Sequence, residues 1–173
     1  TDIPSVCTAN STYSITLDSG DVYQVKATTI GSDLTGTKIE AANGTDQFAV
    51  YSGHSFLRLL ATSNRDPIFE VEYPVSSFGL EYIIPPIKNL AYTQYQVMAA
   101  YDNTDVFING SSSPSATLME GEIYEDTLLR TEVVRGSKPL KVMHFLPSAN
   151  LTSPGYGDPS MAGIVSNEQM FLD

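Results

Sequence analysis

The stretch YQVMAAY, residues 95–101, shows most plainly how this chain of 173 residues folds. Every second side chain falls on the same side of an extended chain, as in a half-buried β-strand. The residues on that side are Tyr95, Val97, Ala99 and Tyr101. Two earlier segments, TYSITLD (12–18) and VYQVKA (22–27), alternate in the same way. We therefore predict three strands of this kind.

Turn-forming clusters separate these segments along the whole chain. Examples are DSGD at 18–21, INGSSSPS at 108–115 and RGSKP at 135–139. No amphipathic helix stands out, and SFLRLLATS (55–63) is short enough to be one helical turn or a strand. Short strands separated by frequent turns predict an all-β protein of antiparallel, sandwich-like units with little helix.

An internal repeat predicts two units in tandem. TLDSGDVY (16–23) matches TLMEGEIY (117–124), and the glycine in each fits a tight turn with positive φ. Each copy precedes a strand–turn–strand pattern, at 36–52 and 130–145. We expect one unit at 1–90 and a related one at 91–173. The segment EYIIPPIKNL (81–90) joins them, and its Pro85-Pro86 pair should end a strand.

The net charge of the chain limits the classes of partner that it can bind. The chain has 9 Lys and Arg against 20 Asp and Glu, which gives a formal net charge of −11. A surface this acidic repels nucleic acid and anionic membranes. No run approaches the ~20 apolar residues of a membrane span. The opening TDIPSVC has no signal-peptide character, so we expect a removed signal or an excised segment if the protein is secreted.

Four N-glycosylation sequons predict secretion. They begin at Asn10, Asn43, Asn109 and Asn150, all in turn-like surroundings. Cys7 is the single cysteine, so no internal disulfide can form. In a secreted chain it would form an intermolecular disulfide or stay a free thiol.

The stretch AVYSGHS (49–55) raises the question of a serine hydrolase, because it contains His54, one of only two histidines. It lacks the G-x-S-x-G pattern of a nucleophile elbow. We therefore predict no enzyme. We expect residues 48–51 to be a buried strand and Ser52-Gly53 the turn after it. His54 and Ser55 should then hydrogen-bond the loop that leaves the turn.

No cofactor is predicted, although the sequence leaves calcium open. His54, His144 and Cys7 match no zinc-ligand spacing. The densest oxygen cluster is YDNTDVFING (101–110), which lacks the pattern of a calcium loop. We favour two turns there, one at Asp102-Asn103 and one at Asn109-Gly110.

Four motifs in order resemble the N-terminal domain of IgG-Fc-binding-protein-like proteins. They are VYSGHS (50–55), FEVEYPVSSFGLEYIIPPI (69–87), YQVMAAYDNTDVFING (95–110) and GDPSMAGIVSNEQMF (157–171). The resemblance makes Gly53, His54 and Ser55 one structural corner and Gly157, Asp158 and Pro159 another.

The chain departs from the family pattern at two places. Phe56 stands where the family often has a cysteine, and Phe78 stands where it has a tryptophan. We expect packing of Phe56, Phe69 and Phe78 to replace the missing disulfide. The family pattern also continues beyond EQMFLD, so we expect the second unit to be truncated at its C-terminus.

The resemblance implies a non-enzymatic, extracellular structural or protein-interaction module, secreted or at the cell surface, as found in mucus, matrix or adhesive glycoproteins. Its partners would be other extracellular proteins, further domains of the same precursor, or copies of itself. We do not infer Fc binding by this chain from the resemblance to the family. The alternative function is glycan binding by exposed tyrosines, and a hydrolase that uses His54 ranks third.

Overall fold

The computed structural model describes residues 7–29, 31–59, 65–147 and 158–170. The chain packs as two compact units, Thr1–Leu34 and Thr35–Asp173. The described part of the first unit contains turns but neither helix nor strand. One turn is closed by the Asp21 N–H, which donates to the carbonyl of Asp18 at 3.0 Å. We describe each unit by itself.

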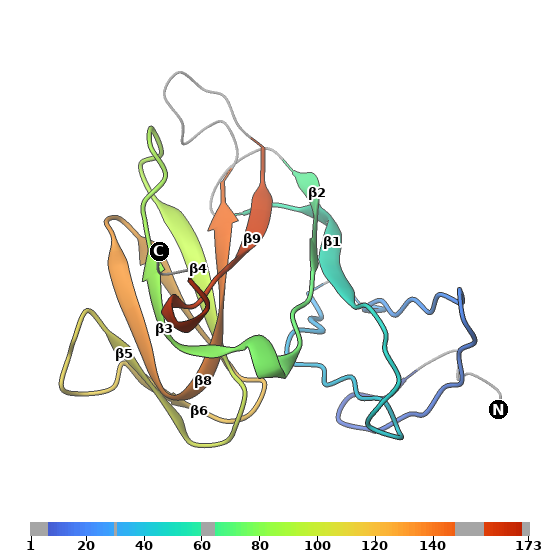
Figure 1. The fold of residues 1–173 in the computed structure, drawn as a ribbon. Helices are drawn as coiled ribbons and strands as arrows, with labels where there is room; N and C mark the ends of the chain where they lie inside the picture. Colours follow the sequence, from blue (N-terminus) through green and yellow to red (C-terminus); the bar gives the residue numbers. More distant parts are fainter. Residues whose placement is uncertain (1–6, 30, 60–64, 148–157, 171–173) are drawn as a thin grey trace. The chain divides into compact units, whose positions relative to one another are not determined.

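The second unit contains nine strands and two short 3-10 turns among its described residues (Figure 1). The strands are β1 (Tyr51–Leu57), β2 (Asp66–Val71), β3 (Gly79–Ile84), β4 (Thr93–Ala99), β5 (Thr104–Ile108), β6 (Ala116–Leu118), β7 (Ile123–Leu128), β8 (Glu132–Leu146) and β9 (Ser160–Ile164). The turns are η1 (Val75–Ser77) and η3 (Asn167–Gln169). All strand pairs are antiparallel. The predicted all-β class is therefore confirmed.

The 15-residue strand β8 organises the larger sheet. Its first half pairs with β3 on one side and β5 on the other, and β6 extends the sheet beyond β5. Its second half pairs with β4 and β9, and β7 extends the sheet beyond β4. One strand thus belongs to both halves, which is a known way for strands to make the corner of a sandwich.

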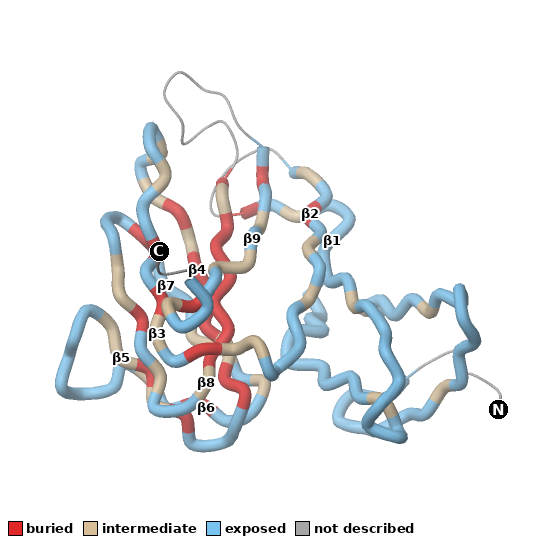
Figure 2. Tube along the Cα trace, in the orientation of Figure 1, coloured by how far each residue is buried: buried red, intermediate tan, exposed pale blue. Residues whose placement is uncertain are grey.

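The main core lies between these two halves, as the buried segments in Figure 2 show. Its members are Tyr82, Ile84, Tyr95, Val97, Ala99, Val106, Leu118, Leu128, Val134, Leu140 and Val142. A smaller cluster covers the other face of β8 and contains Leu59, Ile68, Met143 and Phe145. Residues 140–145 of β8 are therefore buried on both faces.

Strand β4 confirms the alternation seen in the sequence. Thr93, Tyr95, Val97 and Ala99 are buried, and the residues between them are partly exposed. Tyr101 lies beyond the end of the strand and is exposed, so its predicted burial is wrong. The strand ends because the chain turns at Asp102-Asn103 and enters β5.

The two earlier alternating segments are not strands. Residues 12–18 and 22–27 have no strand assignment, and Tyr13, Leu17 and Val25 are exposed. Alternation describes only the side chains, whereas a strand also needs a neighbour for its backbone hydrogen bonds. The described part of the first unit contains no such neighbour.

The predicted strand–turn–strand at 130–145 is a single strand instead. β8 continues through Gly136, which pairs with Val106 of β5, but its register with β3 shifts between Arg135 and Leu140. A Cβ at Gly136 would lie 2.3 Å from the carbonyl oxygen of Lys138, so this glycine permits a tight bend rather than a turn. In the matching stretch 36–52 the turn at 41–44 is present, but no strand begins before Tyr51.

The structure divides the chain at 34/35 rather than at 90/91. The reason is that β3, from the expected first unit, pairs with β8 from the expected second unit. β3 does end at Ile84, just before Pro85-Pro86. Gly20 and Gly121 both have positive φ, as the repeat predicts. The duplication itself stays a prediction.

Candidate interaction site on the β1–β2 hairpin

Two of the four family-like motifs pair with each other. VYSGHS supplies most of β1, and FEVEYP supplies the second half of β2. The strands pair with Gly53 opposite Phe69 and His54 opposite Ile68. Ser52 and Gly53 therefore lie inside a strand, and the prediction that they form a turn is wrong. The partner strand β2, separated from β1 only by residues 58–65, supplies the hydrogen bonds that hold them extended.

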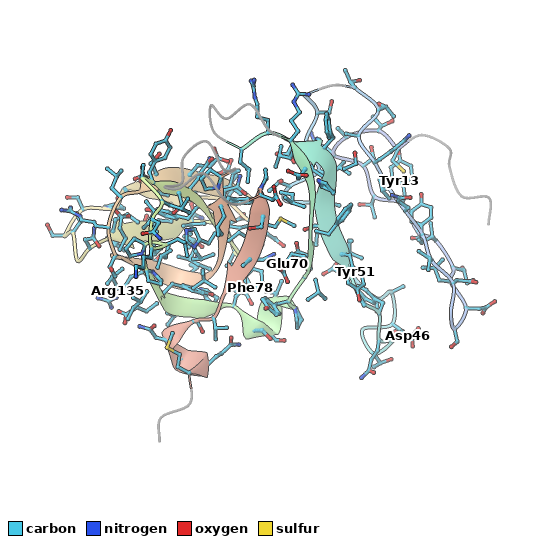
Figure 3. The ribbon with its side chains drawn as sticks, turned by 90° about the horizontal axis from the view of Figure 1, so that it is seen from above. Tyr13, Asp46, Tyr51, Glu70, Phe78 and Arg135 are labelled. Atoms are coloured by element: carbon cyan, nitrogen blue, oxygen red, sulfur yellow. The ribbon has the colours of Figure 1, made fainter. Side chains whose placement is uncertain are left out.

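The hairpin has an inner and an outer face. On the inner face Ile68 packs with Met143 and Phe145 of β8 and with Met161 of β9. On the outer face Tyr51 and Phe69 are 72% and 63% exposed, and the Val71 side chain lies opposite Tyr51. Phe48 and Tyr51 were predicted to be buried, and both are exposed. Tyr51 on β1 and Glu70 on β2 can be followed in Figure 3.

A buried ion pair fastens the hairpin to β8. Lys141 Nζ donates to the carboxylate of Glu72, which follows β2, and Ser52 Oγ of β1 donates to the same carboxylate. Burial lowers the pKa of the Lys141 ammonium to about 8, and the nearby Glu70 carboxylate acts against this shift. Separating the two partners would leave an uncompensated buried charge, which is energetically costly. The ion pair therefore holds the hairpin against β8.

A small cavity of about 80 Å³ lies beside this ion pair. Its lining includes Tyr73, Phe78, Tyr82, Lys141, Ile164 and Gln169. The space is far below the several hundred Å³ of a typical small-molecule site. The hairpin surface is therefore a better candidate for recognition than this cavity.

The SNEQ segment of the fourth motif forms hydrogen bonds with the start of β3, which belongs to the second motif. Glu168 Oε1 accepts a hydrogen bond from the Leu80 N–H at 3.1 Å, and Asn167 Nδ2 donates to Glu81 at 2.7 Å. Gln169 Nε2 donates to the carbonyl of Ser77 at 2.8 Å. Sequence reasoning missed this contact, because residues so far apart give no local pattern.

Neither histidine forms a catalytic arrangement with its neighbours. Exposed His54 accepts a hydrogen bond from the Phe56 N–H at its Nδ1, 3.0 Å away. His144 Nε2 lies 2.6 Å from Thr93 Oγ1, but both residues are buried in the sheet, out of reach of a substrate. Burial lowers the pKa of His144. The sequence predicts a hydrogen bond from His54 to a loop, whereas the bond observed here lies within β1.

The 101–110 segment forms the two predicted turns. Thr104 Oγ1 donates to the carbonyl of Tyr101, and the Ser111 N–H donates to the carbonyl of Ile108 across Asn109-Gly110. Asp102 Oδ1 already accepts the Glu120 N–H at 2.9 Å. Within the described ranges, no three His, Cys, Asp or Glu side chains gather as metal ligands.

Three of the four sequon asparagines are described, and all three are exposed. Asn10 and Asn109 have positive φ, and Asn43 Oδ1 accepts the N–H groups of Thr45 and Asp46. Glycosylation at these positions stays a prediction. Asn150 lies outside the described residues.

The remaining sequence-predicted residues are scattered. Ser55 is exposed within β1, Cys7 is an exposed free thiol, Asp158 is exposed and Pro159 is buried. Gly157 lies outside the described residues. Asp158 and Pro159 precede β9 and are not brought together with the hairpin corner by any described hydrogen bond.

The expected packing of three phenylalanines is wrong. Phe56 and Phe69 are 59% and 63% exposed, and only Phe78 is partly buried. Phe56 instead lies under the guanidinium of Arg65, whose Cζ is 5.5 Å from the ring centroid. Such an exposed cation–π contact contributes about 0.5–1 kcal/mol. Phe56 and Phe69 are left as accessible aromatic surface.

Comparison with known proteins gives one match, to a family model described as IgGFc binding protein, over residues 2–173. Neither curated proteins nor solved structures give a match. No described helix is long and apolar enough to cross a membrane. The match covers almost the whole chain, and its description indicates a protein-binding module. The chain belongs to the IgGFc-binding protein family.

Proposed function

We propose that this chain is a structural and protein-interaction module of a secreted, N-glycosylated protein, and that the outer face of the β1–β2 hairpin contacts other extracellular proteins. One observation supports this most directly. The two motifs that form the hairpin expose Tyr51 and Phe69 side by side with Val71, although aromatic side chains this accessible cost solvation free energy. Aromatic residues are enriched in protein interfaces.

Binding experiments test the proposed function. The full chain, secreted from eukaryotic cells, would be immobilised and exposed to matrix glycoproteins, mucins and IgG Fc. Phe69→Ser should weaken any binding at least about tenfold, the loss typical of an interface aromatic. Leu129→Ser is the matched control, because Leu129 is 70% exposed but lies outside the hairpin. Equal losses from both variants, or no binding to any protein, would contradict the proposal.

Glycan binding is the second candidate, because Tyr51, Tyr73 and Tyr101 are all exposed. A glycan array separates the two functions. Binding that depends on sugars and is lost in Tyr51→Ala would favour the glycan-binding module. Glycosylation is tested by removing Asn43 and Asn109 in turn and measuring the mass of the secreted chain.

A further inference from the structure

A second hollow, of about 270 Å³, lies where the first half of β8 pairs with β5. Its volume is close to the ~300 Å³ at which small-ligand sites begin, so a single sugar ring is an occupant of suitable size. Four of its lining residues are exposed, and the hollow is therefore open to water. The lining residues are Phe107, Gly110, Ser111, Arg135, Gly136 and Ser137.

The side chains of this hollow suit a sugar. Phe107 offers an apolar ring on which the C–H face of a sugar can pack. Ser137 Oγ accepts the Asp105 N–H at 2.8 Å, and a serine hydroxyl that accepts one bond still has its own hydrogen to donate. Arg135 Nε lies 3.4 Å from Glu81 Oε2, a contact that uses one of the five N–H donors of the guanidinium. An apolar surface with a few directed polar groups is the usual composition of a ligand site.

The sequon at Asn109 borders this hollow. The next two residues, Gly110 and Ser111, belong to the lining. Asn109 and Gly110 have φ values of +52° and +74°, and a type I′ turn requires positive φ at both central residues. The Ser111 N–H closes the turn on the Ile108 carbonyl at 3.1 Å. The sequon is therefore presented in a defined turn at the rim of the hollow.

Hydrogen bonds to β8 hold the Asn109 side chain in place. Its Oδ1 accepts the Val133 N–H at 2.9 Å, and its backbone N–H donates to the Val133 carbonyl at 2.8 Å. Nδ2, the atom that carries an N-linked glycan, belongs to the same planar amide, so its direction is set as well. At Gly110 no described atom lies within 4 Å of an added Cβ, which leaves space beside the turn for a sugar.

Phe107 distinguishes this sequon from the other three. It stands two residues before Asn109, and side chains two residues apart lie on the same side of an extended strand. The other sequons have a small residue at the corresponding place, namely Thr8, Ala41 and Ser148. An aromatic ring accompanies the attachment point only at Asn109.

We propose that this hollow holds the first sugar of a glycan on Asn109, with the C–H face of the sugar on the Phe107 ring. Arg135 and Ser137 then donate hydrogen bonds to its oxygens. On attachment Nδ2 loses a proton and bonds to C1 of the sugar, and the diphosphate of a lipid-linked oligosaccharide donor leaves C1 with the bonding electrons. The inference rests on the proposed function, since it requires a secreted chain that is glycosylated at Asn109.

A sugar held in this way stabilises the fold. A sugar that packs on Phe107 removes apolar area from water only in the folded chain, because the hollow exists only there. A glycan at Asn43 has Ala41 at the corresponding place and gains no such contact. The two glycans should therefore differ in their effect on the folding equilibrium.

A full chain with Asn109 as its single sequon tests the contact. Thr12→Ala, Thr45→Ala and Thr152→Ala remove the other three sequons. The same sequence is made in eukaryotic cells, where mass spectrometry measures the glycan, and in bacteria that lack N-glycosylation. In urea denaturation the glycosylated form should have an equilibrium constant of folding about tenfold higher. Trimming the glycan to its first sugar with an endoglycosidase should keep this gain.

The aromatic ring is tested in the same pair of preparations. Phe107→Ala should reduce the gain from the glycan below about twofold, whatever it does to the stability of the bare chain, because only the coupling is compared. Ile83→Ala is the matched control, since Ile83 is 42% exposed and lies opposite Val133, outside the hollow. It should keep the tenfold gain. A chain whose single sequon is at Asn43 should gain less than about twofold.

The outcomes separate this inference from the proposed function. Equal stability of the glycosylated and bare forms, or a gain that persists in Phe107→Ala, would overturn the sugar contact and leave protein binding by the hairpin intact. A secreted chain without a glycan at Asn109 would overturn the contact and also contradict N-glycosylation at this residue. Failure of the binding experiments with Phe69→Ser would leave the sugar contact intact.

Discussion

The Glu168 carboxylate accepts a hydrogen bond from the Leu80 backbone N–H, with 3.1 Å between Oε1 and N. This contact closes the edge of β3 with a residue 88 positions further along the chain. It also joins two family-like motifs that the sequence keeps far apart. Part of the resemblance to the family therefore has a structural reason, and a set of substitutions can test it.

Replacing Glu168 with Ala should lower the free energy of unfolding by about 1–1.5 kcal/mol, because the Leu80 N–H loses its acceptor. Urea denaturation measures the change. Glu168→Gln keeps an acceptor oxygen, so its free energy of unfolding should decrease clearly less. Equal stability of Glu168→Ala and the wild type would show that the contact does not hold β3.

Gly79→Ala should destabilise the protein by about 2 kcal/mol or more, since overpacking at a filled site forces neighbours to move. Its Cβ would lie 2.2 Å from Ser166 Cβ. Gly110→Ala is the comparison, because Gly110 has φ +74° and no atom within 4 Å of the added Cβ. Gly110→Ala should lower the free energy of unfolding by only ~1 kcal/mol, because its backbone becomes strained. The prediction fails if the two substitutions cost the same in thermal unfolding.

Stability should rise with pH above 8 because of Lys141. Its pKa is about 8 in the folded protein against 10.5 for the free group, so in this window the unfolded chain binds more protons. We expect the free energy of unfolding to rise by about 1.5 kcal/mol between pH 8 and pH 9.5. Lys141→Met should abolish the rise, and Lys138→Met, at an exposed position, should retain it. A rise in stability that persists in Lys141→Met would contradict its assignment to Lys141.

Stability should decrease in acid because of His144. Burial lowers the pKa of His144, so the unfolded chain takes up a proton first as the pH falls, and stability decreases. In His144→Gln the loss of stability between pH 7 and pH 5.5 should be smaller, and stability at pH 7 should drop by about 2 kcal/mol. Chemical denaturation at the two pH values measures both effects. An unchanged loss of stability in His144→Gln would contradict the prediction.

The sequence predicted the class of the fold and the interior of β4, because the alternation there coincides with a strand buried on one face. It failed at 12–18, where the same alternation has no partner strand. It also failed at Gly136, where the pattern predicts a turn but β8 continues past a local shift in its register with β3.

The site was predicted only in part, for a related reason. The motif GHS lies in the middle of a strand, where the sequence predicts a turn, because its backbone pairs with β2. The ion pair of Lys141 with Glu72 joins residues 69 positions apart, and no local pattern indicates it. Long-range pairing, rather than local preference, decides these features.

The position of β8 after its partner strands has a consequence for biosynthesis. β3, β4 and β5 all use β8 as a neighbour, and it spans Glu132–Leu146. A chain that emerges from the ribosome N-terminus first cannot complete this sheet until those residues are free. Until then its longer strands expose unpaired edges, a state prone to aggregation. The decisive step of folding therefore waits for the synthesis of β8, and this unit depends on chaperones more than a unit with local pairing would.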